Sequence, residues 1–146
     1  MAVGSFQIPP GFAATTLSGL IQAEVVDVNG NPPQDIIKAG QAFGVKYRWE
    51  LLGSAVPMIA GQWLLRVLFD EIGTLNDGFV PAQPLQVALT PATGAYDATI
   101  DFPAGLTAGP GGSSYQIIAS LSYLNAAGTP GGMGGSVNCG LLGIQP

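Results

Sequence analysis

Hydrophobic and polar residues alternate with a period of two along most of the chain after residue 20, as in strands that bury one face. The clearest run is residues 43–51, where aromatic and aliphatic residues take the odd positions and Lys46, Arg48 and Glu50 take even ones. Residues 63–70 repeat this alternation. Each of the two stretches is therefore expected to form a strand whose apolar side faces the core.

Further strands are expected where short apolar or alternating runs end at glycine, proline or asparagine, the residues that favour turns. These runs are residues 20–28, 36–40, 85–89, 96–102, 115–124 and 137–142. Residues 58–68 could be placed on a helix, but Gly53, Pro57 and Gly61 weaken that interpretation. The sequence predicts seven or eight strands and no convincing helix.

This pattern predicts an all-β fold, namely an antiparallel β-sandwich of the immunoglobulin-like, Greek-key kind. A core tryptophan on an early strand agrees with it, although the Cys-Trp-Cys pattern of true immunoglobulins is missing. Residues 20–146 are expected to form a single sandwich domain. Residues 1–19 are expected to form an N-terminal arm, rather than a strand of the main body, that moves in solvent or lies along a neighbouring subunit.

Composition narrows the classes of function. Of the 146 residues, 47% are hydrophobic and 9% are charged, against about 25% charged in typical soluble domains, so a free monomer would have a sticky surface. A net charge of −5 with four basic residues argues against nucleic acid as a partner.

The sequence also bears on location. No run of 18 apolar residues exists, so no membrane insertion is expected. The N-terminus lacks the features of a signal peptide. This favours the cytoplasm, or a particle assembled there, unless a signal peptide has been removed.

Residue types that carry common catalytic chemistry are scarce. Histidine is absent and Cys139 is the single cysteine, which removes histidine-dependent triads, internal disulfides and cysteine metal clusters. Asp97 and Asp101 would lie about 13 Å apart on one strand, a poor start for a catalytic carboxylate pair. The glycine-rich segments lack phosphate-binding motifs and are expected to be hairpin loops. We therefore expect that the protein is not an enzyme and that it binds no cofactor. Cys139 is expected to be a small buried hydrophobe.

Two groups of residues allow a binding interpretation beside a structural one. Asp70, Glu71 and Asp77 flank the turn after residues 63–70 and form a weak candidate for a calcium site, with a solvated loop as the alternative. Trp49 and Trp63 could be platforms for a sugar or a base, but both have the apolar parity of their strands and are expected in the core.

The candidate partner-binding residues lie on the face opposite the core. Leu64 and Leu68 flank Arg66 on this face. A face in contact with solvent alone does not need leucines on both sides of an arginine. In residues 115–124, Ile118 and Leu124 likewise share the parity of serines. Apolar residues around a lone arginine are typical of protein interfaces. The candidates are Lys46, Arg48, Glu50, Leu64, Arg66 and Leu68.

The order of charges along the chain suggests a mode of assembly. All basic residues lie between residues 38 and 66, and acidic residues follow them. If these segments occupy opposite sides of the sandwich, identical subunits would attract one another head to tail. Adjacent strands could instead pair the charges within one subunit.

The leading hypothesis is a non-enzymatic structural or interaction subunit. It would dock to copies of itself or to a larger protein assembly, helped by the arm from Ser5 to Phe12. The alternative is a secreted or surface module that recognises carbohydrate or peptide through its loops, with calcium at Asp70, Glu71 and Asp77. Stability that depends on calcium would favour the alternative.

Overall fold

The computed structural model describes residues 1–31, 35–73, 77–90 and 94–146, without the side chains of residues 77–84. Within these ranges the only helical element is a short 3₁₀ helix, η1 (Val56–Met58), and the chain is all-β. The strands are β1 (Ala2–Val3), β2 (Ser5–Gln7), β3 (Ser18–Val26), β4 (Ile36–Lys38), β5 (Phe43–Leu52), β6 (Gly61–Glu71), β7 (Asp77–Ala88), β8 (Ala95–Phe102), β9 (Ser113–Asn125) and β10 (Pro130–Gln145).

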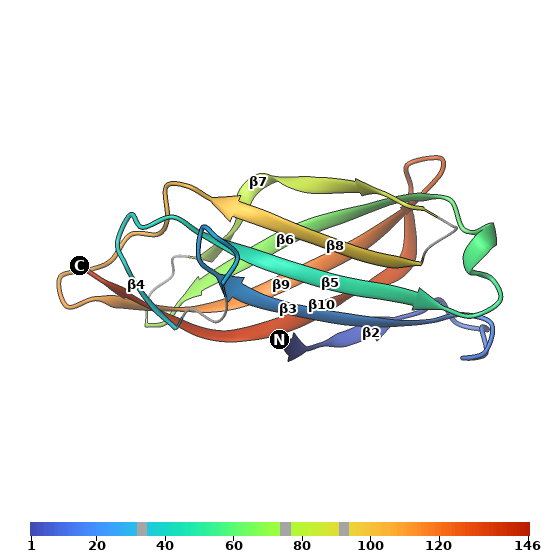
Figure 1. The fold of residues 1–146 in the computed structure, drawn as a ribbon, viewed down its shortest axis with the longest axis horizontal. Coiled ribbons are helices and arrows are strands. Elements are labelled where there is room, and N and C mark those ends of the chain that lie inside the picture. The colour runs from blue at the N-terminus through green and yellow to red at the C-terminus, as the bar shows by residue number, and fades with distance from the viewer. Residues whose placement is uncertain (32–34, 74–76, 91–93) are drawn as a thin grey trace.

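The strands form two sheets, one in front of the other in Figure 1. The first sheet has the order β1-β3-β5-β8, and the second has the order β2-β10-β9-β6-β7. Pairing is antiparallel throughout, except that β4 pairs with the end of β10 in parallel. Buried side chains from both sheets form one hydrophobic cluster. The predicted antiparallel β-sandwich is therefore confirmed.

The last strand is much longer than predicted, because β10 runs through part of the glycine-rich segment that was expected to be a loop. A Cβ atom on Gly134 would lie 2.3 Å from the carbonyl oxygen of Leu121, and one on Gly135 would lie 2.6 Å from that of Ser5. These glycines are therefore explained by the close approach of neighbouring strands.

The N-terminal residues join the sandwich, which corrects the expectation that residues 1–19 form an arm outside it. β1 pairs with β3 in the first sheet, and β2 pairs with β10 in the second. The chain changes sheets at Gly4, where a Cβ atom would lie 2.0 Å from the carbonyl oxygen of Ser136. The Phe6 ring occupies the space that Gly19 leaves open. These contacts tie the two sheets together along one side.

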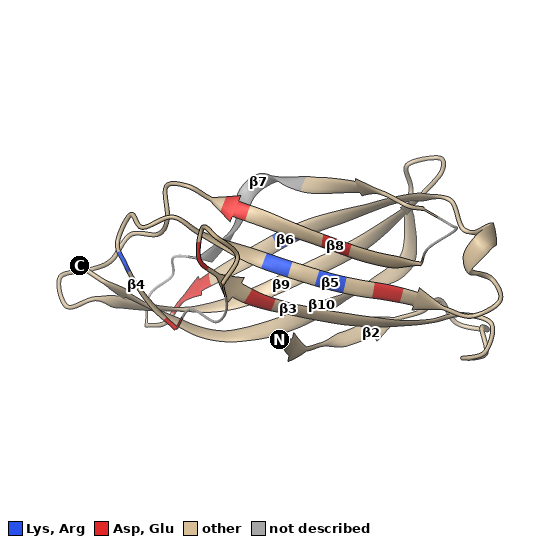
Figure 2. Cartoon of the chain, in the orientation of Figure 1, with Lys and Arg blue, Asp and Glu red and all other residues tan. Residues whose placement is uncertain are grey.

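The outer face of the first sheet carries many of the charges (Figure 2). Arg48 lies opposite Asp97 in the pairing of β5 with β8, and their side chains form an ion pair of 3.4 Å. Both side chains are about half exposed, so the pair adds little stability. Adjacent strands thus pair these two charges within one subunit. Head-to-tail attraction would need basic and acidic residues on opposite sides of the sandwich, and Arg48 and Asp97 lie on the same side. The charged residues of this face are Glu24, Lys46, Arg48, Glu50, Asp97 and Asp101.

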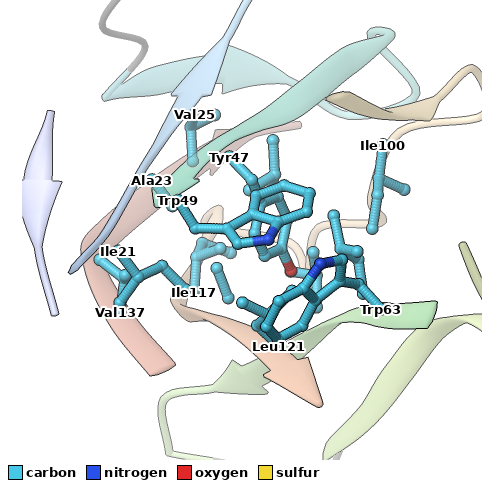
Figure 3. Packing of buried hydrophobic residues seen from close by; sticks show 14 of the residues in the cluster. Ile21, Ala23, Val25, Tyr47, Trp49, Trp63, Ile100, Ile117, Leu121 and Val137 are labelled. Carbon is cyan, nitrogen blue, oxygen red and sulfur yellow. The ribbon is translucent and has the colours of Figure 1, made fainter. Parts of the chain in front are cut away.

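Aromatic side chains fill the middle of the core (Figure 3). The Trp49 ring stacks on Tyr96 at 5.2 Å between centroids, and it meets the Trp63 ring edge-on at 6.1 Å. Both indoles are buried, which confirms their expected place in the core. Neither indole N–H has a hydrogen-bond acceptor among the described residues. Edge-to-face packing places the positive edge of one ring against the negative face of the next.

Tyr47 of β5 makes a polar contact between the two sheets. Its hydroxyl donates a hydrogen bond to the carbonyl oxygen of Arg66 and accepts one of 3.2 Å from the amide of Ser120. Arg66 and Ser120 lie opposite each other on β6 and β9. Burial raises the pKa of Tyr47 far above its ordinary value. The neutral hydroxyl therefore bridges two strands of the second sheet.

We expect Tyr47→Phe to lower the free energy of unfolding by about 1–3 kcal/mol, because the carbonyl of Arg66 and the amide of Ser120 lose a part-buried hydrogen-bond partner. Urea unfolding followed by tryptophan fluorescence measures this loss. Tyr123→Phe is the control, since the Tyr123 hydroxyl bonds to the carbonyl of Ala60 at an exposed position where water can replace it. Equal losses in the two variants would contradict the bridging role of Tyr47.

Candidate interaction surface

The six predicted partner-binding residues lie on two separate surfaces. Those of β5 point outward from the first sheet, and those of β6 point outward from the second, with the core between them. The structure therefore does not bring the six together into one surface, and the binding role of each set stays a prediction. The first set is Lys46, Arg48 and Glu50, and the second is Leu64, Arg66 and Leu68.

The outer side of β6, β9 and β10 is almost free of charge. β9 and β10 contain no charged residue, and the outward charged residues of β6 are Arg66 and Asp70. No further sheet covers this side among the described residues. We call it the neutral face, and its members include Gln62, Leu64, Arg66, Leu68, Asp70, Gln116, Ile118, Ser120, Ser122, Leu124, Ser136, Asn138 and Leu141.

Apolar side chains run through the neutral face between small polar ones. Leu68 lies directly opposite Ile118, and Leu64 lies opposite Ser122. Leu64, Leu68, Ile118 and Leu124 alternate along their strands with buried core residues, so they point away from the core. The parity that the sequence predicts for these four residues is confirmed.

One half of the neutral face is hollowed. Two adjoining depressions of about 470 and 350 Å³ share Ser120, Ser122, Tyr123 and Pro130. Hydroxyl groups and strand backbone make up much of the lining, and Arg66 is the charged residue at the rim. The sequence gives no sign of this hollow, because it depends on which strands are neighbours.

Leu141 also belongs to the neutral face, and sequence reasoning missed it. The pairing of β10 with β9 shifts between Asn138 and Gly140, and Gly140 has a φ of 89°, so one extra residue forms a β-bulge there. Leu141 is consequently 61% exposed, while Leu142 is buried. A lone glycine inside a predicted strand is the signal that could have revealed the bulge.

The structure does not support a shared ion site at the weak calcium candidate. Asp70 and Glu71 are consecutive in β6 and so point to opposite sides of the sheet. The Glu71 carboxylate accepts a hydrogen bond of 3.2 Å from the hydroxyl of Ser113, and its other oxygen lies 3.2 Å from the hydroxyl of Tyr115. The side chain of Asp77 lies outside the described ones. Among the described residues, no group of three acidic, cysteine or histidine side chains is placed to hold a metal.

Neither protein-family models nor curated proteins match the sequence. In the described part of the chain, no helix has the length and apolar character needed to cross a membrane.

We expect calcium to leave the melting temperature of the protein unchanged, within about 1 °C, because Glu71 is engaged by hydroxyl groups and Asp70 faces the other way. Thermal unfolding with millimolar calcium and with excess EDTA measures the effect. A clear rise in melting temperature with calcium would contradict this expectation and favour a calcium-assisted module.

Cys139 packs against the core from the bulged part of β10, as the sequence predicts for a small hydrophobe. Burial raises the pKa of its thiol to about 11.

The reactive thiolate is therefore scarce at pH 8, and we expect a disulfide reagent to label Cys139 slowly in the native protein and rapidly in urea. The native rate should rise steeply between pH 8 and pH 10. Rapid native labelling at pH 8 would contradict the burial of this thiol.

Proposed function

We propose that the chain is a non-enzymatic structural or interaction subunit that binds protein through the neutral face. The observation that carries this proposal is the contrast between the two outer sides of the sandwich. One side carries many charges, while the other carries the half-buried side chains of Leu64, Leu68 and Ile118 among serines and glutamines.

An immunoglobulin-like topology is part of the proposal. In such sandwiches strands A, B and E form one sheet, and strands G, F, C and C′ form the other. The orders β3-β5-β8 and β10-β9-β6-β7 correspond to these two sets. Two side chains support the correspondence. Trp63 is a buried tryptophan on the strand that matches C. Tyr115, near the start of the strand that matches F, donates a hydrogen bond of 2.9 Å back to the carbonyl of Thr107, like a tyrosine corner.

The cost of removing water favours the neutral face as the contact surface. Charged groups are expensive to desolvate unless each finds a partner, so the first sheet's outer face is costly to bury. On the neutral face, β9 and β10 contribute only uncharged side chains. The centres of protein interfaces are likewise poor in charge and contain apolar side chains.

The hollow gives some support to the alternative, a module that binds carbohydrate or peptide. Ser120, Ser122 and Ser136 line it and offer hydroxyl groups to a polar ligand. However, carbohydrate sites gain much of their contact from exposed aromatic rings. Trp49 and Trp63 are both buried, and among the described residues that line the hollow Tyr123, which is half-buried, is the one aromatic. This alternative therefore ranks second.

The proposal is tested by capture experiments with tagged protein in a lysate of its host. We expect Leu68→Asp to abolish the capture of proteins that the unaltered chain retains, because it places a charge in the middle of the neutral face. Leu20→Asp is the matched control, since Leu20 is 56% exposed on the outer side of the other sheet. Melting curves of both variants establish that they are folded.

Two results would overturn the proposal. One is capture of the same proteins by folded Leu68→Asp and by the unaltered chain. The other is a loss of capture that Leu20→Asp shows to the same extent, because the contact would then not be specific to the neutral face.

A further inference from the structure

We infer that the partner of the neutral face is a second copy of the chain, with the two second sheets packed face to face about a two-fold axis. The axis lies in the interface and crosses the strands at Leu68, Ile118 and Asn138, which are neighbours across β6, β9 and β10. This inference rests on the proposed function, because it names the partner of the same surface.

The charges of β6 are arranged symmetrically about this axis. Arg66 and Asp70 lie two residues before and two residues after Leu68 on the same side of β6. A two-fold axis at Leu68 therefore places Arg66 of each copy over Asp70 of the other. In a two-fold symmetric interface each contact between two different residues occurs twice, so opposite charges face each other at two places. Such an arrangement fixes the orientation of the two copies.

The projecting and hollowed parts of the neutral face are also related by this axis. Ser120 lies two residues after Ile118, in the hollow, and Gln116 lies two residues before it. Gln116 is opposite the exposed Leu141 of β10. The axis therefore carries Leu141 of each copy onto the hollow of the other, at the position where Ser136 is opposite Ser120. An apolar projection meets a depression on each side of the axis.

The neutral face is large enough for a stable dimer. β9 has 13 residues, which extend about 40 Å at the usual strand rise, and the three strands of the neutral face are about 15 Å wide at the usual spacing. A face of this size offers about 600 Å² per copy, at the lower end of the range for specific interfaces.

The outer face of the first sheet does not suit a symmetric contact of this kind. It carries Glu24, Glu50, Asp97 and Asp101 against the side-chain cations Lys46 and Arg48, and the ammonium group of Met1 forms an ion pair of 3.7 Å with Glu24. Two copies packed through that side would bring together an excess of negative charge, and like charges in an interface oppose association. The second sheet is therefore the side on which two copies meet.

Sedimentation of the purified, untagged protein over a concentration series tests the inference. We expect a monomer–dimer equilibrium that Leu68→Asp weakens about thirtyfold, the effect of a central interface residue. Leu20→Asp should leave the dissociation constant unchanged. A monomer at every concentration, or equal weakening by both variants, would overturn the inference.

A charge exchange tests the position of the axis with variants that keep the centre of the interface intact. Arg66→Asp alone and Asp70→Arg alone should each weaken the dimer about tenfold, because like charges then meet across the axis. The double variant should recover most of the lost affinity, since opposite charges meet again. A double variant that is weaker than both single variants would overturn this arrangement.

The outcomes separate this inference from the proposed function. A monomeric protein whose capture of other proteins is lost with Leu68→Asp overturns the second copy as partner and leaves the proposed function standing. A monomeric protein whose capture is unaffected by Leu68→Asp overturns both. A dimer with the expected response to the variants supports both.

Discussion

The contact between the inward side chains of β5 and the opposite sheet determines how the rest of the molecule is arranged. Tyr47 and Trp49 are two residues apart and so point to the same side of β5. Tyr47 reaches the backbone between β6 and β9, while Trp49 packs on Trp63 of β6. These contacts set the spacing of the two sheets and the alignment of β6 beneath the first sheet. Because alternation is strict along β6, the same contacts determine which of its residues point outward.

The separation of charged and uncharged outer sides follows from this arrangement. Strands β3, β5 and β8 belong to one sheet, so their outward charges share a surface and partly neutralise one another, as Arg48 and Asp97 do. β9 and β10 are neighbours in the other sheet and contain no charged residue. The fold thus distributes the few charged residues unevenly, with most of them on the outer side of the first sheet. This difference in charge is the reason why the proposed contact is placed on the second sheet.

Local pattern revealed the strands and the parity of their residues, whereas sheet membership depended on distant contacts. The alternation in β5 and β6 identifies Lys46 and Leu64 as outward residues, but it does not say that they belong to different sheets. The ion pair of Arg48 with Asp97 was equally hidden, since it depends on the pairing of β5 with β8. β1 and β2 are too short to show a period. In β10, glycines and a bulge at Gly140 interrupt the pattern.

The neutrality of the second outer side is not explained by packing within the subunit. Close backbone approach excludes larger side chains at Gly134 and Gly135, but this constraint applies to few positions. Ser122 and Asn138 are exposed, and charged side chains there would not disturb the core. Exposed sheet faces in soluble domains normally carry charges at such positions, which also keep molecules apart in solution. A face that lacks charges where the fold would accept them fits one that is covered by a partner.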